Sequence, residues 1–305
     1  MKLGKLGIWV ALDGPIGHFE NDDSAGLGRA TAPRIVNFVR RAETLGYSAI
    51  WMPDGFGRDS FIASALLLAN TQNMIVATGI SSIYSRDPVA SAAAGSALNE
   101  LSGGRFIMGL GVSHRKVVEG IRGHDYTKPV AAMRGYLEGI AGAPYYAASP
   151  AEKTPIVLAA LRGKMLELSR DQADGAHTFN VTPQHTAQAR EILGPGKLLC
   201  VEQKLILETD PAKARAIARA ELELYLGLDN YLNSWRAMGF SDADFANGGS
   251  DHLMDSIIAW GDESALRKRI QEHFDAGADH VCFKPVGPDN HTDMRIIEML
   301  APTAS

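Results

Sequence analysis

The chain has 305 residues, 46% of them hydrophobic, which is enough for a large core in two ordinary domains or in one α/β barrel. Its net charge of −5 and pI near 6.0 argue against nucleic acid as the main partner, and no apolar run reaches the roughly 20 residues of a membrane-spanning helix. The N-terminus leads into a strand-like segment rather than a signal peptide, and Cys200 and Cys282 lie in apolar runs typical of buried, reduced thiols. We therefore expect a cytoplasmic protein that binds neither nucleic acid nor membrane.

Eight apolar segments of strand length alternate along the chain with helical patterns. In the first helix, Pro33–Leu45, the apolar residues share one face and Gly46 follows the last turn. Three later helices start at a capping aspartate, at Asp87-Pro88, Asp210-Pro211 and Asp262. The expected strands are Leu6–Val10, Ser48–Met52, Met74–Ser82, Arg105–Gly111, Pro155–Leu161, Gly175–Val181, Leu198–Leu207 and Asp279–Pro285.

This alternation, without a second run of strands, predicts a parallel sheet, and eight such units favour closure into a (β/α)8 TIM barrel. No linker divides the chain, so we expect one domain over residues 1–305. Three connections are longer than a crossover helix needs: residues 11–32, 113–128 and 212–262. All three follow strands, which places extra loops and helices at the C-terminal mouth of the barrel, especially between the seventh and eighth strands.

The segment Leu98–Ser113 carries both a fold marker and a candidate site. Ser102-Gly103-Gly104 ends a helix, because glycine enters the left-handed backbone region without a Cβ clash. The following run, Phe106–Leu110, is nearly all apolar, as expected for a strand buried on both faces. Gly111–Ser113 then forms a small, open strand end where a flat ligand can approach the backbone.

Familiar cofactor and metal motifs are absent or incomplete. Gly109-Leu-Gly111 begins like a dinucleotide fingerprint, but His114 stands at the third glycine position and no acidic ribose partner is suitably placed, which argues against a Rossmann fold. The sequence has no P-loop, no His-Glu-x-x-His and no Cys/His metal spacing. Solvated loop carboxylates explain Asp22-Asp23 and Asp242-x-Asp244 better than a cation site, so no metal is expected.

The eight strand exits combine small and apolar residues with a few polar groups, a mixture that suits a flat aromatic cofactor. After the fifth strand, Leu161-Arg-Gly-Lys164 leads into the helix Met165–Gln172. Free backbone N–H groups there, together with Arg162 or Lys164, would form a seat for an anion such as phosphate. An ordinary βα turn is the alternative interpretation.

At this point the sequence resembles the luciferase-like flavin and deazaflavin oxidoreductases, especially the branch that uses coenzyme F420. The resemblance follows the family order across residues 1–200 and is weaker beyond them. The family fold is an eight-stranded βα barrel, in agreement with the independent strand count. The matching segments are Ala42–Asp54, Ala77–Ser81, Arg86–Ala90, Leu98–Ser113, Ala159–Leu168 and Ala173–Gly175.

The resemblance implies a cofactor that lies across the mouth, and a non-proline cis peptide around Gly79–Ser82 behind its ring. Its ring would contact the exits of the second, third and fourth strands, and its phosphate the start of the helix after the fifth. The ring contacts would be Asp54, Ile80, Ser81, Gly111, Val112 and Ser113, and the phosphate contacts Leu161, Arg162, Gly163, Lys164 and Met165.

Two departures from the family pattern concern catalysis. Many relatives have Asp-His after the second strand, where this chain has Asp54-Gly55. His114 follows the fourth strand, and an imidazole titrates near neutrality, so His114 could pass a proton while hydride moves; a polar histidine at the rim is the alternative. We take Asp54 and His114 as the catalytic candidates, and we expect His177 to be a hydrogen-bonded core residue.

Positive charge in the loop beside the mouth favours an anionic cofactor. The loop from His114 to Lys128 is basic and would attract the phosphate and oligoglutamate tail of F420, although a solvated basic loop explains the same residues. We therefore expect hydride transfer between F420 and a small alcohol, carbonyl or unsaturated compound. An FMN-dependent monooxygenase is the first alternative, since reduced FMN can activate oxygen, and a non-catalytic flavin-binding barrel is the second.

The substrate pocket is less specified. We expect apolar walls from Trp9, Trp51, Phe56 and Phe179, a lid around Tyr231 and Trp235, and hence a substrate without high charge. Lys204 and Lys284 could bind an anionic substrate only if their side chains point inward. The resemblance also leads us to expect a homodimer.

Overall fold

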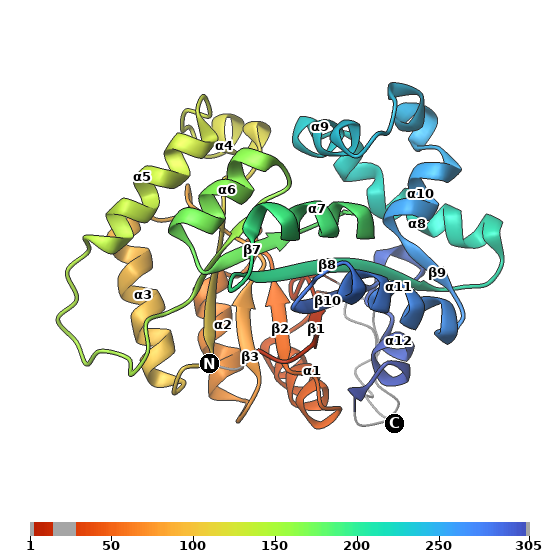
Figure 1. The fold of residues 1–305 in the computed structure, drawn as a ribbon. Helices are drawn as coiled ribbons and strands as arrows, with labels where there is room; N and C mark the ends of the chain where they lie inside the picture. Colours follow the sequence, from red (N-terminus) through yellow and green to blue (C-terminus); the bar gives the residue numbers. More distant parts are fainter. Residues whose placement is uncertain (1–2, 15–28, 303–305) are drawn as a thin grey trace.

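The strands form a closed parallel barrel in the computed structural model, which describes residues 3–14 and 29–302 (Figure 1). Closure follows from β10, which pairs with both β1 and β8. Every strand pairing is parallel, so the predicted (β/α)8 fold is confirmed. The strands are β1 Leu6–Trp9, β2 Ala49–Met52, β3 Ile75–Thr78, β4 Ser81–Ser82, β5 Phe106–Gly111, β6 Ile156–Ala159, β7 Gly175–Thr178, β8 Leu198–Leu207, β9 Ala259–Gly261 and β10 His280–Pro285.

Two of these strands depart from a simple count of eight. The predicted strand Met74–Ser82 is divided into β3 and β4, and both parts pair with β5. The short strand β9 pairs with the outer end of β8 and belongs to the connection between β8 and β10 rather than to the barrel. The barrel therefore has eight strand positions, and the third of them is interrupted near the mouth, between β3 and β4.

Helices cover the outside of the barrel (Figure 1). Those predicted to start at Asp87, Asp210 and Asp262 do so, and each carboxylate accepts a hydrogen bond from a backbone N–H of the first turn. The helices are α1 Ala32–Thr44, α2 Ser60–Ala69, α3 Pro88–Leu101, α4 Arg115–Gly120, α5 Pro129–Ala141, α6 Gly163–Gln172, α7 Pro183–Leu193, α8 Pro211–Leu226, α9 Asp229–Ala237, α10 Asp251–Ile257, α11 Glu263–Asp275 and α12 Met294–Met299, with 3-10 turns η1 Asp242–Gly248 and η2 Pro288–Asn290.

The long connections build the mouth, as predicted. The connection from β8 to β10 holds α8, α9, η1, α10 and β9, and the one from β5 to β6 holds α4 and α5. The two decorations meet, because Lys116 Nζ of α4 donates a hydrogen bond to Gly227 O, between α8 and α9. Most of the first long loop, residues 15–28, lies outside the described residues. No helix in the described ranges is long and apolar enough to cross a membrane.

The core has three parts. The largest lies between the strands and the outer helices, and a second joins α8, α9 and α10 around Leu222 and Trp235. The third fills the barrel lumen, where alternate strand residues point inward, among them Trp51, Cys200 and Cys282. Both cysteines are free and fully buried, as predicted.

The fold marker after α3 also behaves as predicted. Gly103 and Gly104 have φ values of 66° and 91°, which glycine adopts without strain. Arg105 behind them donates hydrogen bonds to the carbonyls of Leu68 and Met74 and to the Thr71 hydroxyl. The marker therefore ties α2, β3 and β5 together at the floor of the barrel, far along β5 from the mouth.

Candidate active site

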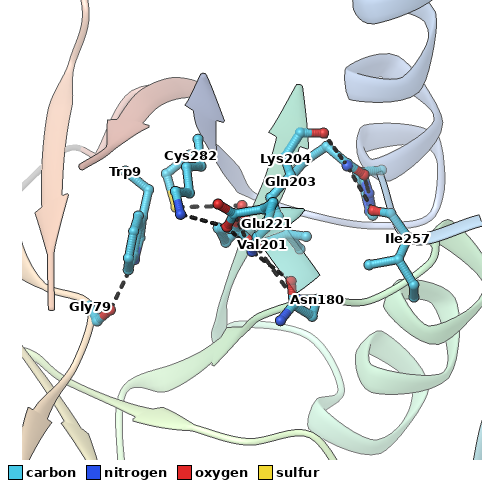
Figure 2. Close-up of polar contacts among 12 residues, drawn as sticks. Trp9, Gly79, Asn180, Val201, Gln203, Lys204, Glu221, Ile257 and Cys282 are labelled. Carbon is cyan, nitrogen blue, oxygen red and sulfur yellow. Dashed lines mark hydrogen bonds and ion pairs between the residues drawn. The ribbon is translucent and has the colours of Figure 1, made fainter. Parts of the chain in front are cut away.

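The β3–β4 junction forms one wall of the mouth. Its Gly79–Ile80 peptide is cis, as the resemblance implied. Trp9 Nε1 donates to Gly79 O at 2.9 Å (Figure 2). Asp54 N donates to Ile80 O at 2.8 Å. The Asp54 carboxylate accepts hydrogen bonds from Ser82 N at 3.2 Å and Ser85 Oγ at 2.6 Å. Asp54 therefore holds the junction in place through both its backbone and its side chain.

The two residues after Gly79 point in different directions. Ile80 is half-buried and faces the end of β5, where a Cβ on Gly111 would lie 2.5 Å from Ile80 Cδ1. Ser81 is buried, and its hydroxyl is 3.2 Å from Ser60 Oγ in α2. The predicted cofactor contact at Ser81 is thus limited to its backbone, because its side chain turns away from the mouth.

The exit of β5 is held by a residue of the next loop. Ser113 has a positive φ of 56°, and its carbonyl accepts a hydrogen bond from Tyr126 Oη at 3.1 Å. Burial raises the pKa of Tyr126, and the positive charges of Arg115 and Arg162 oppose this shift. Tyr126 therefore holds the Gly111–Ser113 strand end through this hydrogen bond.

The start of α6 leaves charge and N–H groups free for an anion. Arg162 is its N-cap without a side-chain cap, and Arg162 and Lys164 are exposed without an ion pair among the described residues. The amide of Met165 already donates to Arg162 O, and its side chain is buried. Leu161 O accepts a hydrogen bond from His185 Nε2 at 2.8 Å. Of the predicted seat, Arg162, Gly163 and Lys164 therefore remain available to a phosphate, and Leu161 and Met165 support them.

His114 lies at the rim between α4 and α9. It precedes α4, its ring centroid is 5.6 Å from that of Tyr231, and its buried Nδ1 has no hydrogen-bond partner among the described residues. Burial lowers the pKa of His114, so the imidazole is neutral at neutral pH.

The opposite side of the mouth contains buried charges that the sequence analysis did not assemble. Lys204 in β8 is 1% exposed, and its Nζ lies 2.5 Å from Asn180 Oδ1 and 3.0 Å from Glu202 Oε1 (Figure 2). Its ammonium also lies 3.8 Å from the centroid of the Phe179 ring. Burial raises the pKa of Glu202 and lowers that of Lys204, while their mutual attraction opposes both shifts.

A residue of the inserted helix α8 completes this group. Glu221 Oε1 lies 2.5 Å from Lys284 Nζ and 3.8 Å from Lys204 Nζ. Lys284, in β10, lies 5.4 Å from the centroid of the Trp9 ring. We call Glu202, Lys204, Glu221 and Lys284 the mouth cluster.

Part of the mouth cluster can be recognised in the sequence. Glu202 and Lys204 share the inward parity of Cys200 in β8, and Lys284 shares that of Cys282 in β10. Both lysines therefore point inward, which was the condition set for binding an anionic substrate. What the sequence did not show was their partner Glu221, which looks like any polar residue of a helix.

Several predicted wall residues are elsewhere. Trp51 is fully buried and stacks on His177, with centroids 4.7 Å apart, whereas Phe56 is 70% exposed on the surface. Trp235 is buried and donates to Asn180 O at 3.0 Å, so it anchors α9 instead of lining a lid. Trp9 and Phe179 follow one another in space, with ring centroids 5.1 Å apart, and the Phe179 ring lies 6.2 Å from that of Tyr231.

His177 is buried in the lumen as expected, and its ring stacks on that of Trp51. No three His, Cys, Asp or Glu side chains of the described residues converge as metal ligands.

Comparison with known proteins finds relatives of similar sequence over most of the chain. The chain is 26% identical over 309 residues to 5,10-methylenetetrahydromethanopterin reductase of Methanolobus tindarius, covering 87% of this chain and 94% of the relative. It is also 26% identical over 333 residues to a Mycobacterium tuberculosis protein that is provisionally named a coenzyme F420-dependent oxidoreductase, covering 88% and 91%.

Solved structures show the same fold. An F420-dependent secondary alcohol dehydrogenase, in complex with an F420-acetone adduct, superposes with a TM-score of 0.75 over 98% of each chain at 12% identity. The sequence model of the luciferase-like monooxygenase family matches residues 16–280. The chain therefore belongs to the luciferase-like monooxygenase family.

Proposed function

We propose that this protein is an oxidoreductase that transfers hydride between coenzyme F420 and a small alcohol, carbonyl or unsaturated compound. The observation that carries the proposal is the junction of three elements at one side of the mouth: the hydrogen-bonded β3–β4 connection, the open end of β5 and the start of α6. The names of the relatives at 26% identity support the choice of cofactor class.

The residues at this side of the mouth fit a deazaflavin with a phosphate. Ile80 and the backbone of Gly111–Ser113 would support the ring, and Asp54 would position the junction behind it. Two N–H groups at the start of α6, with Arg162 and Lys164, would hold the phosphate. When bound, such a cofactor supplies a hydride donor or acceptor that reacts poorly with oxygen.

The chain's own residues would bind and orient the reacting groups. Phe179 and Tyr231 would exclude water from the substrate side, and the mouth cluster would provide hydrogen-bond donors there. We retain His114 as a proton-transfer candidate at the rim, where its neutral ring would contact cofactor or substrate.

Cofactor titration by fluorescence tests this proposal. We expect micromolar or tighter binding of F420, and weaker or no binding of FMN. Charge reversal at Arg162 or Lys164 should weaken F420 binding at least about tenfold, equivalent to about 1.4 kcal/mol, because it removes a phosphate contact. The control Lys268→Glu changes an exposed residue of α11 and should bind as the wild type does.

Each other result has a definite meaning. Unchanged affinity in both reversal variants would remove the phosphate seat, and a lack of binding of either cofactor would remove the oxidoreductase proposal. The family also contains monooxygenases, as its name states, and the same seat would serve FMN. Tight FMN binding without F420 binding would select that alternative, and binding without turnover would select a non-catalytic barrel.

We also propose a cytoplasmic homodimer. Light scattering on the wild type tests the oligomeric state, and a monomeric wild type would contradict the dimer.

A further inference from the structure

The mouth cluster contains two ammonium and two carboxylate groups, and its members differ sharply in exposure. The side chains of Glu202, Lys204 and Glu221 are 0%, 1% and 4% exposed, whereas that of Lys284 is 19% exposed. The formal charge of the cluster is zero, and it stays zero if a proton moves from Lys204 to Glu202. Lys284 is thus the one member that presents N–H groups to the mouth while the others compensate its charge.

We propose that Lys284 binds the reacting oxygen of the substrate and that the substrate is an uncharged carbonyl compound, or the matching alcohol. This inference rests on the proposed function and deepens it. Glu221 would be a positioning residue, since it holds the ammonium through one hydrogen bond and comes from the inserted helix α8.

The position of Lys284 connects it to the cofactor side. Its ammonium lies 5.4 Å from the centroid of the Trp9 ring, and Trp9 Nε1 donates to Gly79 O at the cis junction. An ammonium has three hydrogens, and Glu221 is its one hydrogen-bond acceptor among the described residues. Two donors therefore remain beside the wall that backs the proposed ring, where a substrate oxygen would have to lie.

Charge compensation selects the class of substrate. A carboxylate at Lys284 would lie beside the carboxylate of Glu221, and the repulsion would cancel much of the attraction to the ammonium. An uncharged carbonyl oxygen accepts a hydrogen bond without this penalty. The aromatic rings of Phe179, Tyr225 and Tyr231, with centroids between 4.9 and 6.2 Å apart, suit an apolar organic body.

The chemistry balances with the proposed cofactor as the named co-reactant. In reduction, the carbonyl carbon receives a hydride, the π pair of the C=O bond moves to oxygen, and the oxygen takes a proton from Lys284 Nζ. The product is an alcohol, the cofactor is oxidised by two electrons, and Lys284 regains its proton from solvent. His114 is the weaker acid candidate, because its burial favours the neutral ring.

A matched pair of unreactive probes tests the assignment. Benzamide and benzoate share their shape, but only benzoate is charged. Each is titrated against the F420-loaded protein, and binding is followed by the change in cofactor fluorescence. In the wild type, benzamide should bind at least about tenfold more tightly than benzoate. Lys284→Met should lose benzamide binding, Lys284→Arg should largely keep it, and Lys268→Met, on the outer helix α11, should change nothing.

A variant of the positioning residue Glu221 should strengthen binding of the charged probe, whereas Lys284→Met should weaken binding of the neutral one. Glu221→Gln leaves the cluster with one uncompensated positive charge, so benzoate should bind at least about tenfold more tightly than it does to the wild type. Its control, Glu223→Gln, changes an exposed carboxylate of the same helix and should leave benzoate binding unaltered. A misfolded variant would lose binding of both probes and of F420 instead of gaining an anion site.

The outcomes separate this inference from the proposed function. Failure of the wild type to bind F420 overturns the proposed function and the inference with it. If F420 binds but benzoate binds as tightly as benzamide, or neither probe binds, the assignment of Lys284 is overturned while the cofactor proposal stands. Benzamide binding to Lys284→Met with wild-type affinity would also overturn it.

Discussion

At the exits of β2, β3 and β5, the mouth is made mainly of backbone groups, glycines and short side chains, whereas at the exits of β7, β8 and β10 it is made of buried charges. On the first side, the Asp54 carboxylate binds a backbone N–H group and a serine hydroxyl. On the second side, Lys204 and its partners bind one another in a nearly water-free setting.

The difference suggests a division of labour. A surface made of backbone can approach a flat cofactor closely, and it is fixed by chain conformation, as at Gly111 and the cis Gly79–Ile80 peptide. A cluster of charges that compensate one another offers a strong hydrogen-bond donor. Because its net charge is zero, it does not attract every anion. We infer that the first side would hold the cofactor and the second the substrate, with Trp9 between them.

The largest expected effect is on the charged side. Lys204→Met would leave Glu202 buried without its ammonium partner, so the free energy of unfolding should fall by about 3–5 kcal/mol. Urea denaturation measures this. Lys213→Met, an exposed change in α8, should cost less than about 0.5 kcal/mol. A loss from Lys204→Met no larger than that of the control would show that the cluster is solvated.

The second prediction concerns pH and the lumen beneath the charged side. Burial lowers the pKa of His177 to about 3, well below the ordinary value of 6.5. As pH falls below 6.5, the unfolded chain takes up a proton that the folded state refuses, so stability should drop by about 1.4 kcal/mol per pH unit from this residue until the pH nears 3.

The measurement is the free energy of unfolding between pH 7 and pH 4. His177→Leu should reduce the slope of the unfolding free energy against pH by the contribution of one proton, because the unfolded state loses that site. His252→Gln changes an exposed residue and should leave the slope unaltered. His280 contributes in the same direction, since burial lowers its pKa to about 4. An equal slope in wild type and His177→Leu would show that His177 is protonated in the folded protein.

The two sides also differ in how well the sequence predicts them. The backbone side depends on a local requirement that a single residue reveals, since Gly111 needs the absence of a Cβ. At the opposite end of β5, Gly103 and Gly104 need positive φ, which is just as local. The fold itself follows from the alternation of strands and caps. These features lie within short segments, so a reader of the sequence can assemble them.

The charged side depends on contacts between distant positions. Lys284 and Glu221 are 63 residues apart, and Glu221 is one of several polar residues in α8. The positions of aromatic residues are mispredicted for the same reason. Trp51 and Trp235 can be recognised as large and apolar, but strand register and helix docking decide whether they line a pocket or are fully buried. Side-chain partners of this kind become visible only when the barrel closes.

A smaller effect is expected at Trp9, which connects the two sides. Trp9→Phe keeps most of the ring but removes the donor to Gly79 O, so the junction should loosen and F420 binding should weaken by about 0.5–1.5 kcal/mol, a few-fold to tenfold. Fluorescence titration measures this change. The benzamide preference should persist if Phe still packs against Lys284, and its loss together with unchanged F420 affinity would assign Trp9 to the substrate side alone.

The smallest expected effect is at Ser81, a predicted ring contact whose side chain is buried. Its hydroxyl faces Ser60 in α2, so Ser81→Ala should leave F420 affinity within about twofold of wild type, while stability falls by about 1 kcal/mol through loss of that hydrogen bond. Ser60→Ala is the matched control and should have the same two effects. A tenfold loss of F420 affinity in Ser81→Ala but not in Ser60→Ala would mean that the hydroxyl turns to the mouth when cofactor binds, and the backbone-only character of this side would no longer hold.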